Sequence, residues 1–124
     1  MGRSKIMSTT PDQAIVVFMT TPSREEAGQL AEMLVSKRLA ACVQIMPEME
    51  SVYRWQGKVE LQREILLIAK TVSAKFVELE SEVVKLHSCE TPEIVAFPLT
   101  AGSRPYLEWL SASITEEDQG DANA

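Results

Sequence analysis

The segment KLHSCETPEI, residues 85–94, holds the side chains best suited to bind a transition metal. His87 is the only histidine of the chain, and Cys89, one of two cysteines, lies two residues further on. Imidazole and thiolate groups suit copper and zinc, although a closed zinc site needs four ligands. The same segment is also typical of a helix end followed by a turn, because Pro92 disfavours helix at Thr91. We expect a helix end and turn first, and a metal-binding patch second.

A thiol hydrolase is the enzymatic alternative for the same pair of residues. Such an enzyme needs a Cys–His pair held in place by a third group. No aspartate occurs between Asp12 and Asp118, so the folded region offers none to orient His87. We therefore expect no enzymatic activity and no required cofactor, with copper as the candidate ligand.

The composition is that of an acidic, globular chain of one domain. Its 124 residues are 45% hydrophobic and 24% charged, with a formal net charge of -6, and this length can bury a sizeable core. A chain without a basic stripe binds nucleic acid and anionic membrane surfaces poorly, because both depend on neutralising phosphates. No apolar run approaches the ~18 residues of a membrane span. Residues 1–13 lack the apolar region of a secretory signal, and two cysteines in such a chain indicate free thiols in a reducing compartment.

Apolar periodicity predicts the element order β-α-β-β-α-β-α. We expect strands at residues 14–21, 41–55 with an interruption at Pro47, 59–71 and 94–99, and helices at 23–38, 73–87 and 103–114. The first six elements match the split β-α-β, or ferredoxin-like, plan of the α+β class, in which two helices cover one face of an antiparallel sheet. Residues 14–114 then form the domain. Residues 1–13 are expected to be a flexible tail, and residues 115–124 a disordered acidic one.

Short motifs mark the ends of several elements. Ser23 and Glu26 have the spacing of a capping box at a helix start. Pro47 cannot donate to a strand ladder and therefore marks a bulge or an edge, and Pro98 does the same in the last strand. Gly57 supplies the positive φ of a tight hairpin turn.

The strand at residues 59–71 is too long for the domain that contains it. Thirteen residues span roughly 43 Å, whereas a domain of ~100 residues has a diameter of roughly 33 Å. Tyr53 and Trp55 lie on the overhanging tip. The inner end is apolar on both faces, with Ile65, Leu67 and Ala69 on one and Leu66 and Ile68 on the other. Helices cover one face only, so we expect another copy of the chain to cover the second.

Several segments resemble the CutA family, the divalent-cation-tolerance proteins. They are KRLAACVQI at 37–45, SVYRWQGKVE at 51–60, EILLIAKT at 64–71, HSCETPEI at 87–94 and YLEWLSASI at 106–114. The resemblance spans about residues 14–114 and implies a ferredoxin-like protomer in a homotrimer whose long hairpins pair across subunits. It also implies a cytoplasmic bacterial protein linked to copper tolerance.

The resemblance implies a metal site as well. The family motif usually reads His-Pro-Tyr-x-x-Pro; this chain keeps His87 but has Ser88 and Cys89 in place of the Pro and Tyr. The family's acidic residue on the third strand corresponds to Glu64. Some members have a copper-linked cysteine on the first strand, where this chain has Met19, a weaker but soft ligand. His87 and Glu64, with Cys89 or Met19, are thus the candidate ligands of a weak copper site between subunits.

Four further residues are candidates for a ligand cleft. Tyr53 and Trp55 either pack the hairpin tip or wall a small-molecule pocket, and Lys70 and Glu93 either form a partly buried ion pair or line the cleft. The family trimer resembles that of the nitrogen regulator PII, which gives an alternative function: a signalling trimer that binds an anionic metabolite. The cations available for it are Arg54, Lys58, Arg63 and Lys70, although the chain has no glycine-rich phosphate loop.

Overall fold

The computed structural model describes residues 10–115, so most of the two predicted tails, at 1–9 and 116–124, lies outside the described residues. The described part is an α+β fold, as predicted. Its elements are β1 (Ala14–Thr21), α1 (Arg24–Ser36), β2 (Cys42–Ile45), β3 (Met49–Trp55), β4 (Lys58–Val72), the 3-10 turn η2 (Ser73–Lys75), α2 (Phe76–Leu86), β5 (Ile94–Pro98) and α3 (Arg104–Ser113).

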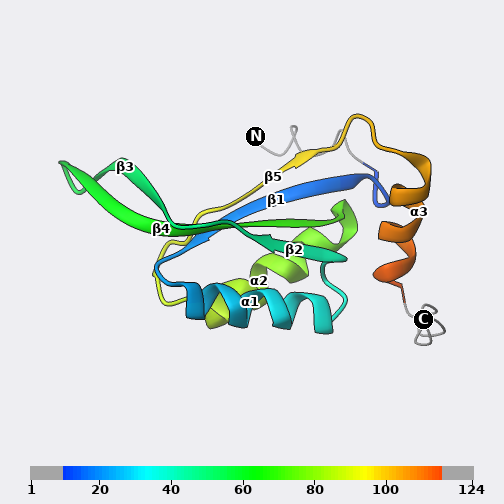
Figure 1. Ribbon diagram of the computed structural model, residues 1–124, viewed down its shortest axis with the longest axis horizontal. Helices are drawn as coiled ribbons and strands as arrows, with labels where there is room; N and C mark the ends of the chain where they lie inside the picture. Colours follow the sequence, from blue (N-terminus) through cyan, green and yellow to red (C-terminus); the bar gives the residue numbers. More distant parts are fainter. Residues whose placement is uncertain (1–9, 116–124) are drawn as a thin grey trace.

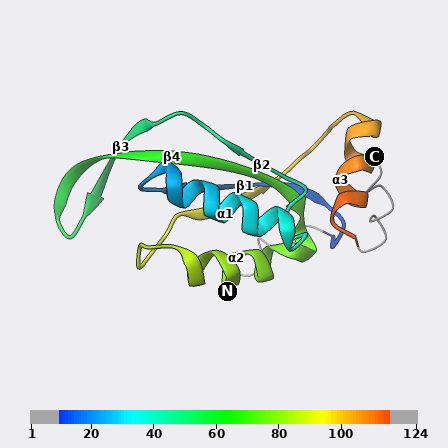
Figure 2. The same ribbon diagram turned by 60° about the horizontal axis from the view of Figure 1, so that its bottom comes forward.

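The sheet has the strand order β2-β4-β1-β5, and β3 pairs with the outer part of β4. Every pairing is antiparallel. This confirms the ferredoxin-like plan, with β1 and β4 at the centre. Pro98 ends β5, which among the described strands pairs only with β1 and is therefore an edge strand, where proline is tolerated. Helices α1 and α2 lie on one face of the sheet, and α3 lies at the end away from the β3–β4 hairpin (Figures 1 and 2).

The main core lies between this sheet and the two helices. Alternate residues of a strand point to one face, and the inward set is buried: Ile15, Val17 and Met19 on β1, and Ile65, Leu67 and Ala69 on β4. They pack against buried residues of both helices: Ala27, Leu30, Leu34, Leu79 and Val83.

Helix α2 differs from the predicted helix at both ends. It begins at Phe76, because residues 73–75 form a 3-10 turn. Leu86, expected on the buried stripe, is 43% exposed. His87 has left the helix, with φ -73° and ψ 141°, yet its side chain is buried. The apolar stripe therefore ends at Val83, and the extended backbone of His87 turns its ring inward.

At one end of the sheet, the face opposite helices α1 and α2 is covered by another helix of the same chain. Val72 packs there with Leu110 and Ile114 of α3. The prediction that only another copy covers this face is thus wrong at that end. Elsewhere the face is open, since Val95 and Phe97 of β5 are 49% and 44% exposed.

Strand β4 is longer than predicted and carries the hairpin beyond the helices (Figure 1). Its 15 residues span roughly 50 Å. Gln56 and Gly57 form the turn with φ values of 50° and 80°, the pattern of a type I′ turn. The predicted tight turn is confirmed.

Pro47 lies in a one-residue bulge between β2 and β3. Ile45 pairs with Leu67 and Met49 pairs with Glu64. Residues 46–48 on one strand therefore face residues 65–66 on the other. Bulges bend a strand and increase its twist, so this bulge sets the direction in which the hairpin leaves the domain.

Candidate ligand pocket

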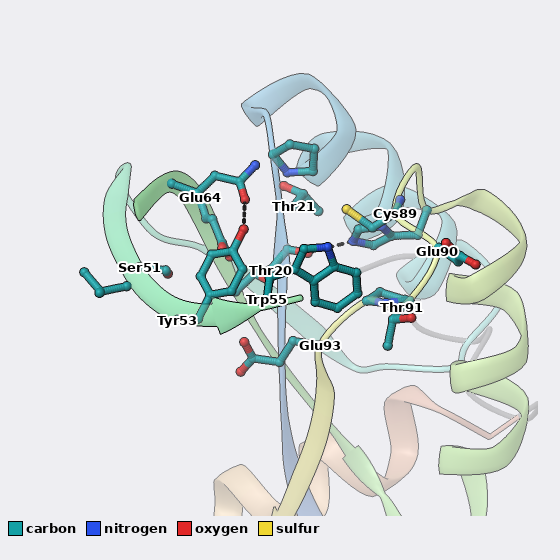
Figure 3. A pocket seen from close by; sticks show the side chains of 15 residues that line it. Thr20, Thr21, Ser51, Tyr53, Trp55, Glu64, Cys89, Glu90, Thr91 and Glu93 are labelled. Atoms are coloured by element: carbon teal, nitrogen blue, oxygen red, sulfur yellow. Dashed lines mark hydrogen bonds between the residues drawn. The ribbon is translucent and has the colours of Figure 1, made fainter. Parts of the chain in front are cut away.

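A pocket of about 750 Å³ lies where the hairpin, the end of β1 and the segment after α2 meet. Most of the site residues expected from the sequence line it: Tyr53, Trp55, Glu64, His87, Cys89 and Glu93. Figure 3 shows Tyr53 and Trp55 reaching in from the hairpin, opposite Cys89, Glu90 and Thr91 of the segment after α2. The tertiary structure thus brings together residues that are far apart in the sequence.

The hairpin contributes residues of both strands to the pocket, most of them from one face. Ser51, Tyr53 and Trp55 alternate on β3, and Gln62 lies directly across from Ser51 on β4. Residues that pair across an antiparallel ladder point to the same face. The Tyr53 hydroxyl donates a hydrogen bond to Gln62 Oε1, which holds the phenol ring in place.

His87 uses both ring nitrogens in hydrogen bonds to the main chain. Nε2 is 2.7 Å from the carbonyl oxygen of Thr20, and Nδ1 is 3.0 Å from the amide nitrogen of Cys89. A carbonyl accepts and an amide N–H donates, so these partners require a neutral ring with its proton on Nε2. Its side chain is 1% exposed. His87 therefore connects β1 to the segment after α2, and a metal ion would have to displace one of these bonds.

Glu26, which sequence reasoning placed only in a capping box, holds the same segment. The Ser23 hydroxyl oxygen accepts a hydrogen bond from the Glu26 amide, so the Ser23 half of the box is confirmed. The Glu26 carboxylate, however, accepts from the amide of Ser88 at 2.9 Å and lies 3.5 Å from His87 Nδ1. A local sequence motif cannot reveal this partner, because it comes from the other end of the domain.

Two of the expected site residues lie away from the pocket. Met19 is 0% exposed and belongs to the core beneath the helices. Lys70 donates to Gln44 Oε1 at 2.8 Å, and its Nζ lies 5.8 Å from the centre of the Tyr106 ring. The Lys70–Glu93 ion pair considered from the sequence does not form. Lys70 pairs with Val16 of β1, whereas Ile94, the residue after Glu93, pairs with Met19. The two pairing positions are three residues apart on β1, which separates Lys70 from Glu93.

The charges that line the pocket are all negative. They belong to Glu64, Glu90 and Glu93, and no lysine or arginine lines it. Within residues 10–115, none of these carboxylates forms an ion pair with a basic side chain. A cleft lined by one sign of charge raises the local concentration of the opposite ion. This pocket therefore attracts cations. Glu90 was missed because nothing in its sequence spacing marks it.

The carboxylates are spread around the pocket. No group of three or more His, Cys, Asp or Glu side chains in the described part of the chain is close enough together to hold one metal ion. The thiol of Cys89 is exposed. The described part of one chain therefore supplies scattered ligands and no complete coordination shell.

Comparisons with known proteins agree with this fold. The family model of the CutA1 divalent ion tolerance protein matches residues 15–113. A divalent-cation tolerance protein CutA from Thermus thermophilus is 50% identical over 95 residues, which cover 77% of this chain and 92% of that protein. A solved Thermus thermophilus structure has a TM-score of 0.79, at 47% identity, over 81% of this chain and 97% of that one.

More distant organisms give similar matches. The chloroplastic protein CutA of Arabidopsis thaliana is 47% identical over 81% of this chain, which spans only 55% of that plant protein. A solved structure from Archaeoglobus fulgidus, described as a periplasmic divalent cation tolerance protein, has a TM-score of 0.80 at 39% identity over 82% of this chain and 99% of that one. In the described residues, no helix is long and apolar enough to cross a bilayer.

Proposed function

Because the chain belongs to the CutA1 divalent ion tolerance family, we propose that it is a cytoplasmic homotrimer that binds divalent cations, copper among them, in clefts between its subunits. The pocket at the base of the hairpin is one wall of each cleft. Binding is weak, and the protein takes part in the tolerance of such cations.

The acidic lining of the pocket carries this proposal. Glu64, Glu90 and Glu93 offer oxygen ligands without competing basic side chains, and the exposed thiol of Cys89 offers a soft one. Copper binds nitrogen, oxygen and sulfur sites more tightly than most divalent ions, and thiolates select Cu(I). Because one subunit holds no complete shell, affinity is low unless a neighbouring copy adds ligands.

The hairpin supports the oligomer. In the described residues β3 pairs only with β4, so its other edge has free backbone groups, and such edges pair readily with another chain. Apolar side chains along the hairpin have no cover: Val52, Val59 and Leu61 are 66%, 67% and 61% exposed. The open face of the sheet adds Val95 and Phe97. A trimer that pairs hairpins across subunits buries these surfaces.

An anionic metabolite, as in a PII-like signalling trimer, has less support. The pocket holds carboxylates where such a ligand needs lysine or arginine, and Lys70 is already bonded to Gln44. A thiol enzyme has little support as well, because His87 gives both nitrogens to main-chain groups and neither to the Cys89 thiol. We therefore propose no catalytic activity.

Copper calorimetry on the assembled protein tests the cation site. We expect weaker copper binding in Glu64→Gln and in Cys89→Ser, and unchanged binding in Glu80→Gln, which alters an exposed carboxylate of α2 outside the pocket. Magnesium should bind less tightly than copper. Equal copper affinity in all four proteins would remove the pocket from the metal function.

Light scattering at micromolar concentration tests the assembly. We expect three chains per particle and a melting temperature that rises with protein concentration, because unfolding is coupled to dissociation. Ile68→Asp places a carboxylate on the open face of β4 and should dissociate the trimer. A stable folded monomer of the unaltered chain would contradict the proposal.

A further inference from the structure

We infer that the pocket binds an organic cation, a protonated amine attached to a small apolar body. The inference rests on the proposed cation site and identifies the kind of cation that this site fits in addition to a metal ion. The size of the pocket, its aromatic wall and the spread of its carboxylates each point to such a ligand.

The size of the pocket exceeds the needs of a metal ion. A water molecule occupies about 30 Å³, so an ion with six waters takes up on the order of 200 Å³. The pocket encloses about 750 Å³, within the range of roughly 300–1,000 Å³ that is typical of small-molecule sites. The pocket therefore has room for an organic ligand as well as for a hydrated ion.

Two aromatic rings form the hairpin side of the pocket. Tyr53 and Trp55 lie two residues apart on β3, and both line the cavity (Figure 3). Within one chain they are 37% and 48% exposed, so part of each side chain is open to the cavity. The bond from the Tyr53 hydroxyl to Gln62 fixes one ring in advance. Tryptophan and tyrosine faces attract ammonium groups, tryptophan most strongly, and they also pack against apolar bodies.

The arrangement of the carboxylates decides between a point charge and an extended cation. Glu64, Glu90 and Glu93 line one pocket, yet with Cys89 and His87 they do not converge on a common metal position. They come from β4 and from the segment after α2, on different walls. An ammonium group needs only one such carboxylate for a charge-assisted hydrogen bond, and the others favour further positive charge along the ligand.

Matched probes that differ only in charge test this inference on the assembled protein. Phenethylamine is cationic at neutral pH, phenethyl alcohol is neutral, and phenylacetate is anionic, on similar apolar bodies. In a Trp109→Phe background, Trp55 is the only tryptophan, since the chain has two, so its fluorescence reports on the pocket alone. We expect phenethylamine to bind at least about tenfold more tightly than the alcohol, and phenylacetate not to bind. No binding of the amine at millimolar concentration, or equal binding of the anion, would overturn the inference.

Variants locate the amine by calorimetry. We expect Trp55→Leu and Glu93→Gln each to weaken phenethylamine binding about tenfold. Glu80→Gln, on the exposed surface of α2 and outside the pocket, should leave it unchanged. Equal losses in Glu80→Gln and Glu93→Gln would show that the amine responds to the net charge of the protein, which overturns the site.

Copper titration of the same samples separates this inference from the proposed function. If copper binds in the pocket and the amine does not, the inference fails and the metal function stands. If the amine binds and copper does not, the proposed metal function fails and the organic-cation site stands. Competition between the two ligands would place both in the same pocket.

Discussion

The inner and outer halves of β4 share one strand geometry but have opposite surroundings. The inner half, from Ile65 onward, pairs with β1 on one side and with β2 on the other, and Leu67 is 0% exposed. Within residues 10–115 the outer half pairs only with β3, and Val59 and Leu61 are 67% and 61% exposed. The hairpin extends in space beyond the ends of helices α1 and α2, which therefore do not cover it (Figure 2). Burial along β4 is therefore determined by the elements that pack against each half, and not by the geometry of the strand.

The two halves of β4 therefore have different roles. The inner half, packed between helices and strands, should hold most of the stability of a subunit. The outer half leaves an edge, apolar side chains and the aromatic wall of the pocket available for assembly and binding. The following variants, ordered from the largest expected effect to the smallest, test this division.

Leucine truncation compares the two halves directly. We expect Leu67→Ala to lower the free energy of unfolding by about 2–5 kcal/mol, because it opens a cavity in the closed core. Leu61→Ala removes the same atoms from a position that is 61% exposed within one chain and that only a neighbouring copy would cover. Its loss should be smaller than that of Leu67→Ala and should appear as dissociation at low protein concentration. Chemical denaturation, with the oligomeric state followed by light scattering, measures both. Equal losses would mean that the hairpin is as much a part of the core as the inner half.

Removal of the His87 ring tests the junction between the halves. We expect His87→Ala to lower the free energy of unfolding by about 1–3 kcal/mol, because the buried carbonyl of Thr20 loses its donor. Hydrogen exchange at the Cys89 amide should accelerate, since that N–H loses its acceptor. Cys89→Ser keeps the same main-chain bond and serves as the control. Unchanged protection of this amide in His87→Ala would refute the connecting role of the ring.

The hairpin turn provides a smaller effect outside the core. Gly57 has φ 80°, and we expect Gly57→Ala to destabilise the turn by about 1 kcal/mol, because a Cβ disfavours this region. Gln56→Asn is the control, since asparagine is common in the left-handed region. Thermal melts with circular dichroism should show a folded subunit in both. Complete unfolding of Gly57→Ala would show that the inner half does not fold without the hairpin.

The smallest effect concerns a surface contact of the helix layer and depends on pH. Hydrogen bonds from Lys37 and then Lys85 lower the pKa of the Glu82 carboxyl below its ordinary value of 4.5. A lowered folded-state pKa stabilises the fold above pH 4.5 and loses that contribution as pH falls through the folded-state value. The stability difference between the unaltered chain and Glu82→Gln should thus be present at pH 7 and vanish on acidification. A difference that grew towards low pH would contradict this sign.

Several features of the fold could be predicted from local sequence. The apolar runs located β1 and β4, Gly57 identified the turn, and Pro47 marked the interruption at which the bulge lies. The start of α2 was misplaced, because the 3-10 turn that precedes it has no separate periodicity. In α3, Tyr106 and Trp109 are 37% and 47% exposed, because apolar periodicity marks one face of a helix but not whether anything covers it.

The residue types of the site could also be found in the sequence, but not their partners. His87 was singled out as the only histidine, and only the folded chain pairs its nitrogens with Thr20 and Cys89. Glu26 looked like a capping residue, and the fold directs its carboxylate to Ser88. Sequence spacing cannot supply such partners, because they depend on how distant elements pack.

The sequence by itself determined the strands and helices, the length of the hairpin and the resemblance to the CutA family, because periodicity, turn residues and motifs are local properties. The tertiary structure alone decided that Met19 and Lys70 lie outside the pocket and that Glu90 lies in it. It also decided that the charged residues of the lining are all acidic and that both nitrogens of His87 are occupied. These properties depend on which residues distant segments bring together, and that is set by the packing of the helices on the sheet and by the direction in which the hairpin leaves it.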